Sequence, residues 1–322
     1  MSTDKVKILF IAGWGRSGST IVGNILSQCK GLFHVGELWY LWERGIQENR
    51  LCGCNERFSN CQVWQSILHR HRKKGNLIPS SKMIALHRKF ARTRNLPKML
   101  LYRHGESADS EFPVYTNEIA SLFHNIVEAT GEEIIVDSSK IPSYGYILSR
   151  IPSLSVSILH LIRDPRGTGY SWRKQKFDPA QERYMVKNSL VKNSVLWTVW
   201  NFSIEKLWRD QANSNYMQVR YEDFASQPRQ IIERILRFID IEDSLDFFKG
   251  SSEITLRSHH TVSGNPVRTK TGTITIQPDL EWKRKLGIFE ILLTSALTAP
   301  LLHRYGYPIL PRPGVKDPIK PE

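Results

Sequence analysis

Apolar residues fill the chain almost without a break from position 6 to position 12, and the run ends at Gly13. Such a β-branched-rich run is typical of a strand that is buried on both faces of a parallel sheet. A glycine-rich loop follows over residues 13–18, and residues 20–28 have the pattern of a helix. The chain therefore opens with a strand, a loop and a helix.

The same order of strand and helix recurs further along the chain. Short apolar runs over residues 133–136, 156–162 and 217–220 predict strands, and a helical pattern over 228–239 follows the last of them. Alternation of this kind predicts an α/β fold in which a mostly parallel central sheet has helices on both faces. Ligands of such folds bind at the carboxyl ends of the strands, where the loop after the first strand would lie.

We expect one domain over residues 1–322, because α/β folds often run past about 200 residues as a single unit. A basic helical cap is expected as an insertion at about residues 61–110. Between Cys61 and Gly105 there is no acidic residue, while lysine and arginine occur eleven times. The cap is either a docking face for an acidic acceptor or nucleic acid, or merely a solvated basic face.

The charge of the chain favours anionic partners. Lysine and arginine total 45 against 31 acidic residues, a formal net charge of +14 at pH 7, which suits a nucleotide, an acidic glycan, a membrane surface or nucleic acid. The apolar run at residues 8–12 is too short for a signal peptide. A second apolar stretch at 286–302 contains Glu290 and Pro300 and is shorter than a bilayer requires. We therefore expect a cytoplasmic protein.

Three of the four cysteines lie close together, at Cys52, Cys54 and Cys61. Four cysteines in a chain of this length do not make a disulfide scaffold. The cluster would suit zinc if His69 or His71 supplied a fourth ligand, but its spacing is not a standard zinc-finger pattern. We expect a tight turn lined by cysteines and no bound metal.

Residues 13–20 have the frame of a phosphate-binding loop, G-x-x-x-x-G-x-[ST]. Its backbone N–H groups and the start of the following helix would attract an anion; the alternative is a purely structural turn. An ATP or GTP hydrolase has lysine where this chain has Ser19, and here the cation stands three positions earlier at Arg16. This shift counts against a triphosphate with its metal ion and fits a single phosphate-linked leaving group. The candidate contacts are Arg16, Ser17, Gly18, Ser19 and Thr20.

A second candidate anion site follows the predicted strand at 156–162. Arg163 stands at the end of this strand, and Ser171 lies eight residues beyond it in a predicted helix. Both side chains would then share one sheet edge with the first loop. Two phosphate-directed sites on one edge imply a ligand that is phosphorylated at two separate places. The alternative is a surface pair between Arg163 and Asp164, with Ser171 merely exposed.

The two motifs together resemble those of sulfotransferases that use 3′-phosphoadenosine-5′-phosphosulfate (PAPS). In that family the first loop binds the 5′-phosphosulfate, and an arginine with a serine eight residues later binds the 3′-phosphate. Residues 16–20, Arg163 and Ser171 match position by position, and residues 221–224 match a further recurrent segment. The loop is closer to the carbohydrate and tyrosylprotein branches than to the cytosolic small-molecule branch, which has lysine at the position of Arg16.

The resemblance also covers the C-terminal part of the chain. Residues 260–268, with Trp282 downstream, are similar to a family segment that forms a lid over the nucleotide. The resemblance implies a lid at about residues 257–285. Asn265 is expected to shape its turn and to lie at the cofactor, and Arg268 is expected to contact the 3′-phosphate.

The resemblance implies a catalytic base as well. Glu37 follows Gly36 as in tyrosylprotein sulfotransferases, whose glutamate takes the proton of the acceptor, and an apolar cleft would raise its pKa. His34 is the rival base, and Glu37 could instead be only a partner of a helix dipole. Arg16 is expected to stabilise the leaving group. Lys140 is either a further catalytic cation or the structural partner of Asp137.

Taken together, the resemblance implies metal-independent transfer of a sulfuryl group from PAPS to a hydroxyl or amine of an acceptor. The acceptor is not readable from the sequence, although the charge slightly favours one that is anionic or presented at a membrane. Two alternatives are a P-loop small-molecule kinase and a basic nucleic-acid-binding protein that uses residues 69–104. Neither explains both anion motifs, so nucleic acid is not the expected partner.

Overall fold

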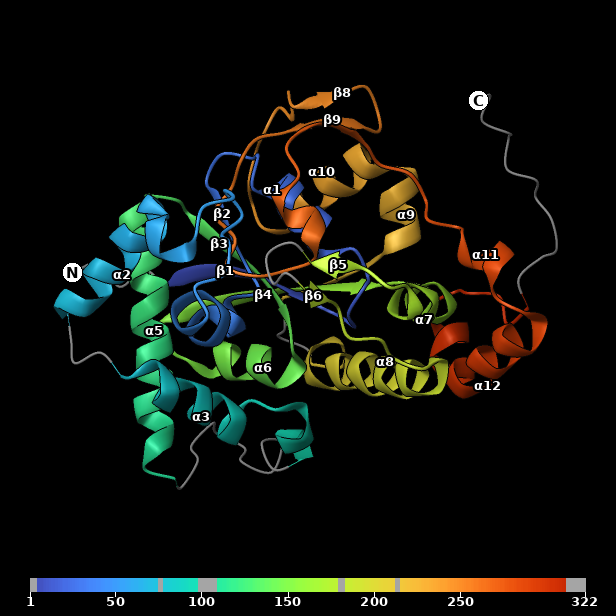
Figure 1. Ribbon diagram of the computed structural model, residues 1–322, viewed down its shortest axis with the longest axis horizontal. Helices are drawn as coiled ribbons and strands as arrows, with labels where there is room; N and C mark the ends of the chain where they lie inside the picture. The colour runs from blue at the N-terminus through green and yellow to red at the C-terminus, as the bar shows by residue number, and fades with distance from the viewer. Residues whose placement is uncertain (1–4, 75–77, 98–108, 179–182, 212–214, 311–322) are drawn as a thin grey trace.

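The computed structural model describes residues 5–74, 78–97, 109–178, 183–211 and 215–310. Its centre is a five-stranded sheet with the strand order β2-β3-β1-β4-β7, in which every neighbouring pair is parallel (Figure 1). The predicted α/β fold is confirmed. The strands are β1 (Val6–Ala12), β2 (Leu32–Gly36), β3 (Ile134–Lys140), β4 (Leu154–Ile162) and β7 (Tyr216–Arg220).

The side chains of β1 show why its sequence is apolar throughout. Ile8 and Phe10 belong to one hydrophobic core, whereas Leu9 and Ile11 point to the opposite face and belong to a second core. All four are at most 1% exposed. A strand that lies between two helical layers needs apolar residues at every position, and this is the pattern that the sequence has.

Helices cover both faces of the sheet (Figure 1). One core is closed by α1 (Ser19–Leu26), α9 (Tyr221–Ser226) and α10 (Pro228–Phe238), which confirms the helical patterns predicted at 20–28 and 228–239. The other core is closed by α5 (Glu111–Thr130), α6 (Pro142–Arg150) and the end of α8 (Leu190–Ile204). The loops at the carboxyl ends of the strands are thereby held between two packed layers.

The insertion between β2 and β3 contains the basic segment. Three short helical turns, η1 (Leu38–Tyr40), η2 (Leu41–Gln47) and η3 (Phe58–Asn60), precede α2 (Gln62–Lys74), α3 (Ser80–Phe90) and η4 (Thr93–Asn95). α2 packs on α5, and α3 packs on η2. Residues 75–77 and 98–108 of the expected cap, His104 among them, lie outside the described residues.

The remaining described elements, all after β4, are two small sheets, the α-helices α7, α11 and α12, and the short helical turns η5 and η6. A three-stranded antiparallel sheet has the order β10-β9-β8, and β5 pairs with β6. The helix α12 contains the apolar stretch at 286–302 in large part, and no helix within the described ranges is long and apolar enough to cross a membrane. The elements are α7 (Pro165–Arg173), β5 (Phe177–Asp178), β6 (Arg183–Tyr184), η5 (Glu205–Arg209), β8 (Phe248–Lys249), β9 (Glu253–Leu256), η6 (Pro266–Thr269), β10 (Gly272–Thr275), α11 (Trp282–Lys285) and α12 (Ile288–Arg304).

The surroundings of the cysteine cluster differ from the expectation. His71 is buried, with its Nε2 atom 2.8 Å from a carboxylate oxygen of Glu118, and His69 is exposed. The histidine that lies at the cysteines is His260. Because 199 positions separate it from Cys61, sequence spacing could not reveal the pair.

Candidate active site

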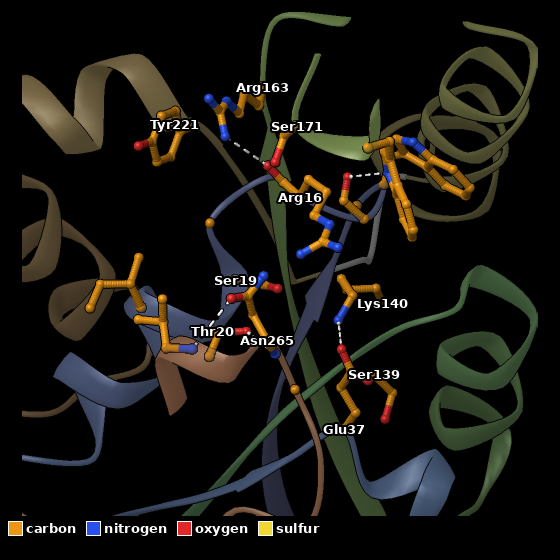
Figure 2. Close-up of a pocket in the computed structure, with 18 of the residues that line it drawn as sticks. Arg16, Ser19, Thr20, Glu37, Ser139, Lys140, Arg163, Ser171, Tyr221 and Asn265 are labelled. Atoms are coloured by element: carbon orange, nitrogen blue, oxygen red, sulfur yellow. Dashed lines mark hydrogen bonds and ion pairs between the residues drawn. The ribbon is translucent and has the colours of Figure 1, made fainter. Parts of the chain in front are cut away.

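A cavity of about 890 Å³ lies where the carboxyl ends of the five parallel strands meet. Each strand brings a residue to it: Arg16 follows β1, Glu37 follows β2, Lys140 ends β3, Arg163 follows β4 and Tyr221 follows β7. Arg163 and Tyr221 lie at one end, which we call the arginine end, and Glu37 and Lys140 lie at the other, the glutamate end (Figure 2). Arg16 lies between the two ends.

The loop after β1 curls tightly, as its glycines predict. Gly18 has a φ of 90°, a conformation that L side chains rarely adopt, and a Cβ atom added there would lie 2.6 Å from the ring of Tyr221. The helix α1 begins directly afterwards, at Ser19, and both Ser19 and Thr20 line the cavity. The first N–H groups of a helix have no acceptor within the helix. This turn therefore offers donors to an anion in the cavity.

One of the five predicted loop contacts does not reach the cavity through its side chain. Ser17 is 1% exposed, and its hydroxyl donates a hydrogen bond of 2.8 Å to the backbone oxygen of Trp14. The hydroxyl fixes the shape of the loop, because it satisfies a carbonyl within the turn.

Arg16 lies in the cavity with a nitrogen that has no partner. Its backbone has a φ of 69°, and its guanidinium lies 4.8 Å above the ring of Trp172 and 3.2 Å from the sulfur of Met185. Its Nε atom is buried without a hydrogen-bond partner among the described residues. Burial lowers the pKa of Arg16, against the opposing charges of Glu37 and Asp178. A buried donor without a partner is costly, and an anion in the cavity would satisfy it.

Arg163 is held in place from several sides at the arginine end. Its Nη2 atom donates to Asp279 at 2.9 Å, and its Nη1 atom donates to the backbone oxygen of Arg16 at 3.1 Å. The guanidinium lies 4.4 Å above the ring of Tyr221, and Trp197 donates to the backbone oxygen of Arg163 at 2.9 Å. The loop after β1 and the end of β4 are thus joined directly.

Ser171 lies in α7 and lines the same end of the cavity (Figure 2). The alternative pair between Arg163 and Asp164 does not form. Asp164 instead caps α7 by accepting from the backbone N–H of Arg166, and it also pairs with the Arg166 side chain at 2.6 Å. Arg163 is therefore left facing the cavity.

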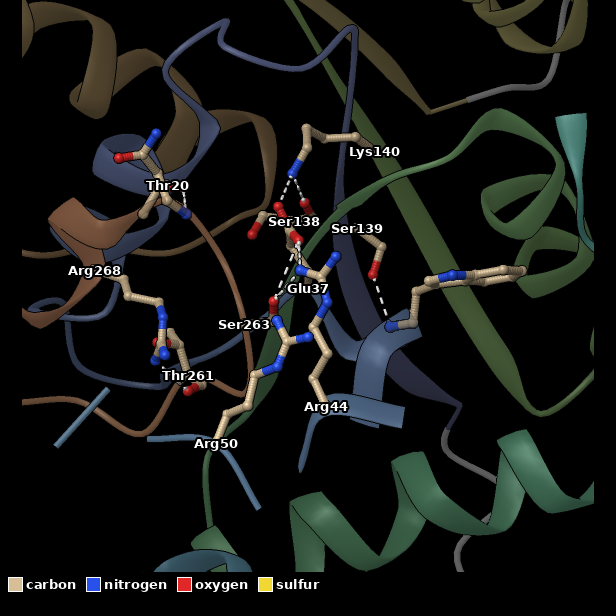
Figure 3. A network of polar contacts seen from close by, with 12 residues as sticks. Thr20, Glu37, Arg44, Arg50, Ser138, Ser139, Lys140, Thr261, Ser263 and Arg268 are labelled. Carbon is tan, nitrogen blue, oxygen red and sulfur yellow. Dashed lines mark hydrogen bonds and ion pairs between the residues drawn. The ribbon is translucent and has the colours of Figure 1, made fainter. Parts of the chain in front are cut away.

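Glu37 is surrounded by cations at the glutamate end (Figure 3). One carboxylate oxygen accepts from the Nζ atom of Lys140 at 2.5 Å, and the other lies 3.6 Å from Arg44 and 3.5 Å from the hydroxyl of Ser263. Burial raises the pKa of Glu37, but the charges of Lys140 and Arg44 outweigh it and lower the pKa below its ordinary value. The expectation that the pKa of Glu37 is raised is wrong. The carboxylate lies beside two cations, Lys140 and Arg44, as well as beside apolar side chains.

Lys140 pairs with Glu37 and not with Asp137. Its backbone has a φ of 69°, which turns the side chain out of the line of β3, and its Nζ atom also donates to the backbone oxygen of Ser138 at 2.8 Å. Asp137 accepts instead from the backbone N–H and the hydroxyl of Ser139, and burial raises the pKa of Asp137 to about 7. Lys140 is therefore a cation of the cavity.

His34, the rival base, does not line the cavity. It is 1% exposed in β2, and its Nε2 atom lies 3.1 Å from the hydroxyl of Ser138. Its ring packs against α1 so closely that a Cβ atom on Gly23 would fall 2.3 Å from it. Burial lowers the pKa of His34 well below its ordinary value. A buried, neutral imidazole with no access to the cavity has no path to an acceptor.

The lid segment reaches the loop, but one of its two predicted contacts points elsewhere. The backbone N–H of Asn265 donates to the hydroxyl of Thr20 at 3.3 Å, and Asn265 lines the cavity. Arg268 is 4% exposed and donates to the backbone oxygens of Leu51 at 2.6 Å and Thr261 at 3.3 Å. Arg268 does not line the cavity, because its guanidinium holds the lid to the insertion.

The cavity is strongly cationic, and sequence reasoning found only part of this charge. Among the residues that the structure describes, eight lysine and arginine side chains line it, against the two carboxylates of Glu37 and Asp279. Burial, and next the nearby charge of Arg16, lower the pKa of Lys176. An excess of like charge in a cleft favours an anionic ligand. The cations that were not singled out from the sequence are Arg44, Arg92, Arg94, Lys176 and Lys270.

The fold is that of sulfotransferases. A sulfotransferase domain from the curacin biosynthetic pathway is similar over 96% of this chain and 100% of its own, with 18% identity and a TM-score of 0.56. A sulfotransferase domain from the Synechococcus PCC 7002 olefin synthase (18% identity, 96% and 97% coverage) and a Mycobacterium avium sulfotransferase (12% identity, 96% and 78% coverage) have TM-scores of 0.46 and 0.49.

The family itself is shown by sequence. The model of the sulfotransferase family matches residues 9–245, so this chain belongs to the sulfotransferase family. A comparison with curated proteins found none that matches. Because the chain belongs to this family, transfer of sulfuryl groups is its general chemistry, and the kinase and nucleic-acid alternatives lose their support.

Proposed function

We propose that the chain transfers the sulfuryl group of PAPS to a hydroxyl, or an amine, of an acceptor by in-line displacement without a catalytic metal ion. The observation that carries this proposal is the presence of two anion-directed sites in one cavity, the loop at residues 16–20 and the pair Arg163 and Ser171. The two sites adjoin, because Arg163 donates to the backbone oxygen of Arg16 at 3.1 Å. A ligand with two separate phosphate groups, such as PAPS, suits this arrangement.

The residues present fit such a donor. Ligand cavities commonly have volumes of about 300–1,000 Å³, and the cavity of about 890 Å³ lies in this range. The Nε atom of Arg16 is a buried donor without an acceptor among the described residues, and a phosphosulfate oxygen would supply one. Arg16, Ser19 and Thr20 would hold the 5′-phosphosulfate, and Arg163 and Ser171 would hold the 3′-phosphate.

Glu37 is the proposed base. Its ionised carboxylate would accept the proton of the acceptor hydroxyl while the acceptor oxygen forms a bond to sulfur. The bond between sulfur and the bridging phosphate oxygen breaks, and the bisphosphate leaves with the electron pair. Arg16 and Lys140 would neutralise the charge on this oxygen. A move of Lys140 toward the leaving group would also remove one cation from Glu37 and raise its pKa as it takes the proton.

The lining of the cavity favours an anionic acceptor. Arg92 and Arg94, from the end of the basic insertion, line the cavity together with Trp39 and Tyr40. Guanidinium groups in this position would attract a sulfated, phosphorylated or carboxylated acceptor, free or presented at a membrane. We also propose a cytoplasmic location, because the four cysteines are unpaired, as is usual in reducing compartments.

Thermal unfolding with adenosine 3′,5′-bisphosphate tests the donor. A ligand that binds only the folded state at about 100 times its Kd stabilises the protein by about 2.7 kcal/mol, so the wild-type midpoint should rise by several degrees. AMP and ATP with Mg²⁺ should have little effect. Arg163→Ala should abolish the bisphosphate effect, whereas Arg237→Ala, at an exposed position of α10, should keep it.

The experiment then extends to transfer. Radiolabelled PAPS is incubated with panels of glycans, phenols, lipids and tyrosine peptides, and label should pass to members of one panel. Stabilisation by ATP with Mg²⁺ alone would reject the proposal in favour of a kinase. Binding of nucleic acid that falls steeply with salt, without any bisphosphate effect, would favour the other alternative.

A further inference from the structure

Four potential metal ligands gather outside the cavity. Three cysteine sulfurs and a nitrogen of one histidine lie within 4.8 Å of one another, and they come from Cys52, Cys54, Cys61 and His260. The sulfur of Cys61 lies 3.3 Å from the Nδ1 atom of His260. Tetrahedral zinc with Zn–S bonds of about 2.3 Å separates its ligand atoms by about 3.8 Å. The observed spacing is therefore close to that of an occupied site.

The backbone of the cysteine segment is shaped to bring its sulfurs together. The backbone N–H of Asn55 donates to the oxygen of Cys52 at 3.0 Å and closes a tight turn, in which Asn55 has a φ of 68°. Gly53, inside this turn, donates to the oxygen of Thr261 at 2.9 Å. A Cβ atom on Gly53 would lie 2.6 Å from a ring nitrogen of His259. Only glycine allows the two segments to approach this closely.

The segment that carries His260 is also held in place by a hydrogen bond. The indole N–H of Trp64, in α2, donates to the backbone oxygen of His260 at 2.6 Å. Cys52 and Cys61 are 0% and 1% exposed, so two of the three thiols are buried. His260 is partly exposed, which leaves an entry path for an ion.

We propose that Cys52, Cys54, Cys61 and His260 bind one structural zinc ion. Three sulfur ligands and one imidazole select a soft or borderline metal over magnesium or calcium. Four protein ligands complete a tetrahedron and leave no open position for substrate, which is the arrangement of structural sites. Binding would displace the thiol protons of the three cysteines, whose sulfurs then bond to zinc as thiolates.

The zinc ion would fasten the lid segment to the insertion after β2. The same lid segment runs on to Val262, which donates to the oxygen of Val35 at 2.9 Å, and to Ser263, whose hydroxyl lies 3.5 Å from Glu37 (Figure 3). Arg268 adds the bond to Leu51, next to Cys52. The ion would therefore hold the lid residues that border the glutamate end, and this role is independent of which donor the cavity takes.

The metal content of the purified, untagged full chain tests the proposal. Elemental analysis should find about one zinc ion per chain after dialysis without chelator. Exchange of zinc for Co²⁺ should produce the thiolate charge-transfer and intense visible absorption of tetrahedral cobalt–sulfur sites. Cys61→Ser and His260→Ala should lose most of the zinc. Cys29→Ser, which removes a buried thiol elsewhere, should retain it.

The wild-type measurements decide the matter even if a variant fails to fold. Reduced protein that neither contains zinc nor takes it up from buffer overturns the proposal, and so does a Co²⁺ spectrum typical of oxygen ligands. A disulfide between Cys52 and Cys61 in protein purified without oxidant would also overturn it. Zinc retained equally by Cys61→Ser and Cys29→Ser would place the ion elsewhere. None of these outcomes depends on PAPS.

Discussion

The two ends of the cavity differ in the ion pairs that they contain. At the arginine end one cation, Arg163, is held by one carboxylate, and the side chain of that carboxylate, Asp279, is 36% exposed. At the glutamate end one carboxylate, Glu37, is held by Lys140 and Arg44, and its own side chain is only 13% exposed. The first end can give up its partner to water at small cost, whereas the second cannot.

This difference suits two different tasks. Asp279 accepts a hydrogen bond from Arg163. In the proposed binding role a phosphate group would take the place of Asp279, whose carboxylate would then be solvated by water. Glu37 is fixed by two cations and a hydroxyl, so that it stays ionised and in one orientation. A cation that binds a ligand needs a counter-ion that the ligand can displace. A catalytic group needs neighbours that hold it in its reactive state and orientation. Each of the following experiments tests one side of this comparison.

The largest effect is expected at the glutamate end. Glu37→Gln keeps the shape of the side chain and removes the proton acceptor, so turnover with any acceptor found in the screen should fall by about 10²-fold or more. Affinity for adenosine 3′,5′-bisphosphate should not weaken, because Glu37 carries no positive charge to lose. Single-turnover rates and calorimetric binding measure the two quantities separately.

Lys140→Met serves as the companion variant at the same end. It removes the cation proposed for the leaving group and should also lower the rate, but through weaker charge stabilisation and with Glu37 still present. If Glu37→Gln loses less than about tenfold in rate while Lys140→Met loses more, Glu37 only orients Lys140 and is not the base.

The cations that follow β1 and β4 could be predicted from local sequence patterns, whereas the contacts of Arg44 and Ser263 with Glu37 could not. A loop after β1 and an arginine after β4 must meet at one sheet edge, because parallel strands end on the same side. Arg16, Arg163 and Ser171 could therefore be predicted together. Arg44 reaches Glu37 from a helical turn in the insertion, and Ser263 reaches it from 226 positions away. No periodicity in the sequence encodes such contacts.

His34 and Arg268 have side chains that suit a functional role, but in the structure both have structural roles. His34 has the ordinary properties of a base, but the register of β2 turns it toward α1 and away from the cavity. Arg268 lies in the expected lid, yet its guanidinium satisfies two backbone oxygens. Which face a side chain occupies depends on tertiary contacts, and these are set by segments far away in the sequence.

At the arginine end we expect a moderate gain in ligand affinity, in contrast to the losses of rate expected at the glutamate end. Asp279→Asn removes the charge that competes for Arg163 and keeps an oxygen for the backbone N–H of Glu281. Bisphosphate affinity should rise by about 3- to 10-fold, since a partly exposed ion pair is worth about 1 kcal/mol. Calorimetric titration measures the change, and Asp210→Asn, at a surface ion pair outside the cavity, is the matched control.

The result at Asp279 separates two roles. Weaker binding in Asp279→Asn would mean that the carboxylate orients Arg163 for the ligand, and the contrast between the two ends would then disappear. An equal gain in Asp210→Asn would show that only the net charge of the protein matters.

The smallest expected effect is that of pH on the rate of transfer. The pKa of Glu37 is lowered from its ordinary value of 4.5, because Lys140 and Arg44 outweigh its burial. The base is then ionised throughout the neutral range, and the transfer rate to a hydroxyl acceptor should change by less than about twofold between about pH 6 and pH 8. The stability that these ion pairs give is complete above the unfolded pKa and is lost only as pH falls through the lower folded one. A fall in rate with a midpoint near pH 6.5, the ordinary value for histidine, would contradict Glu37 as the base.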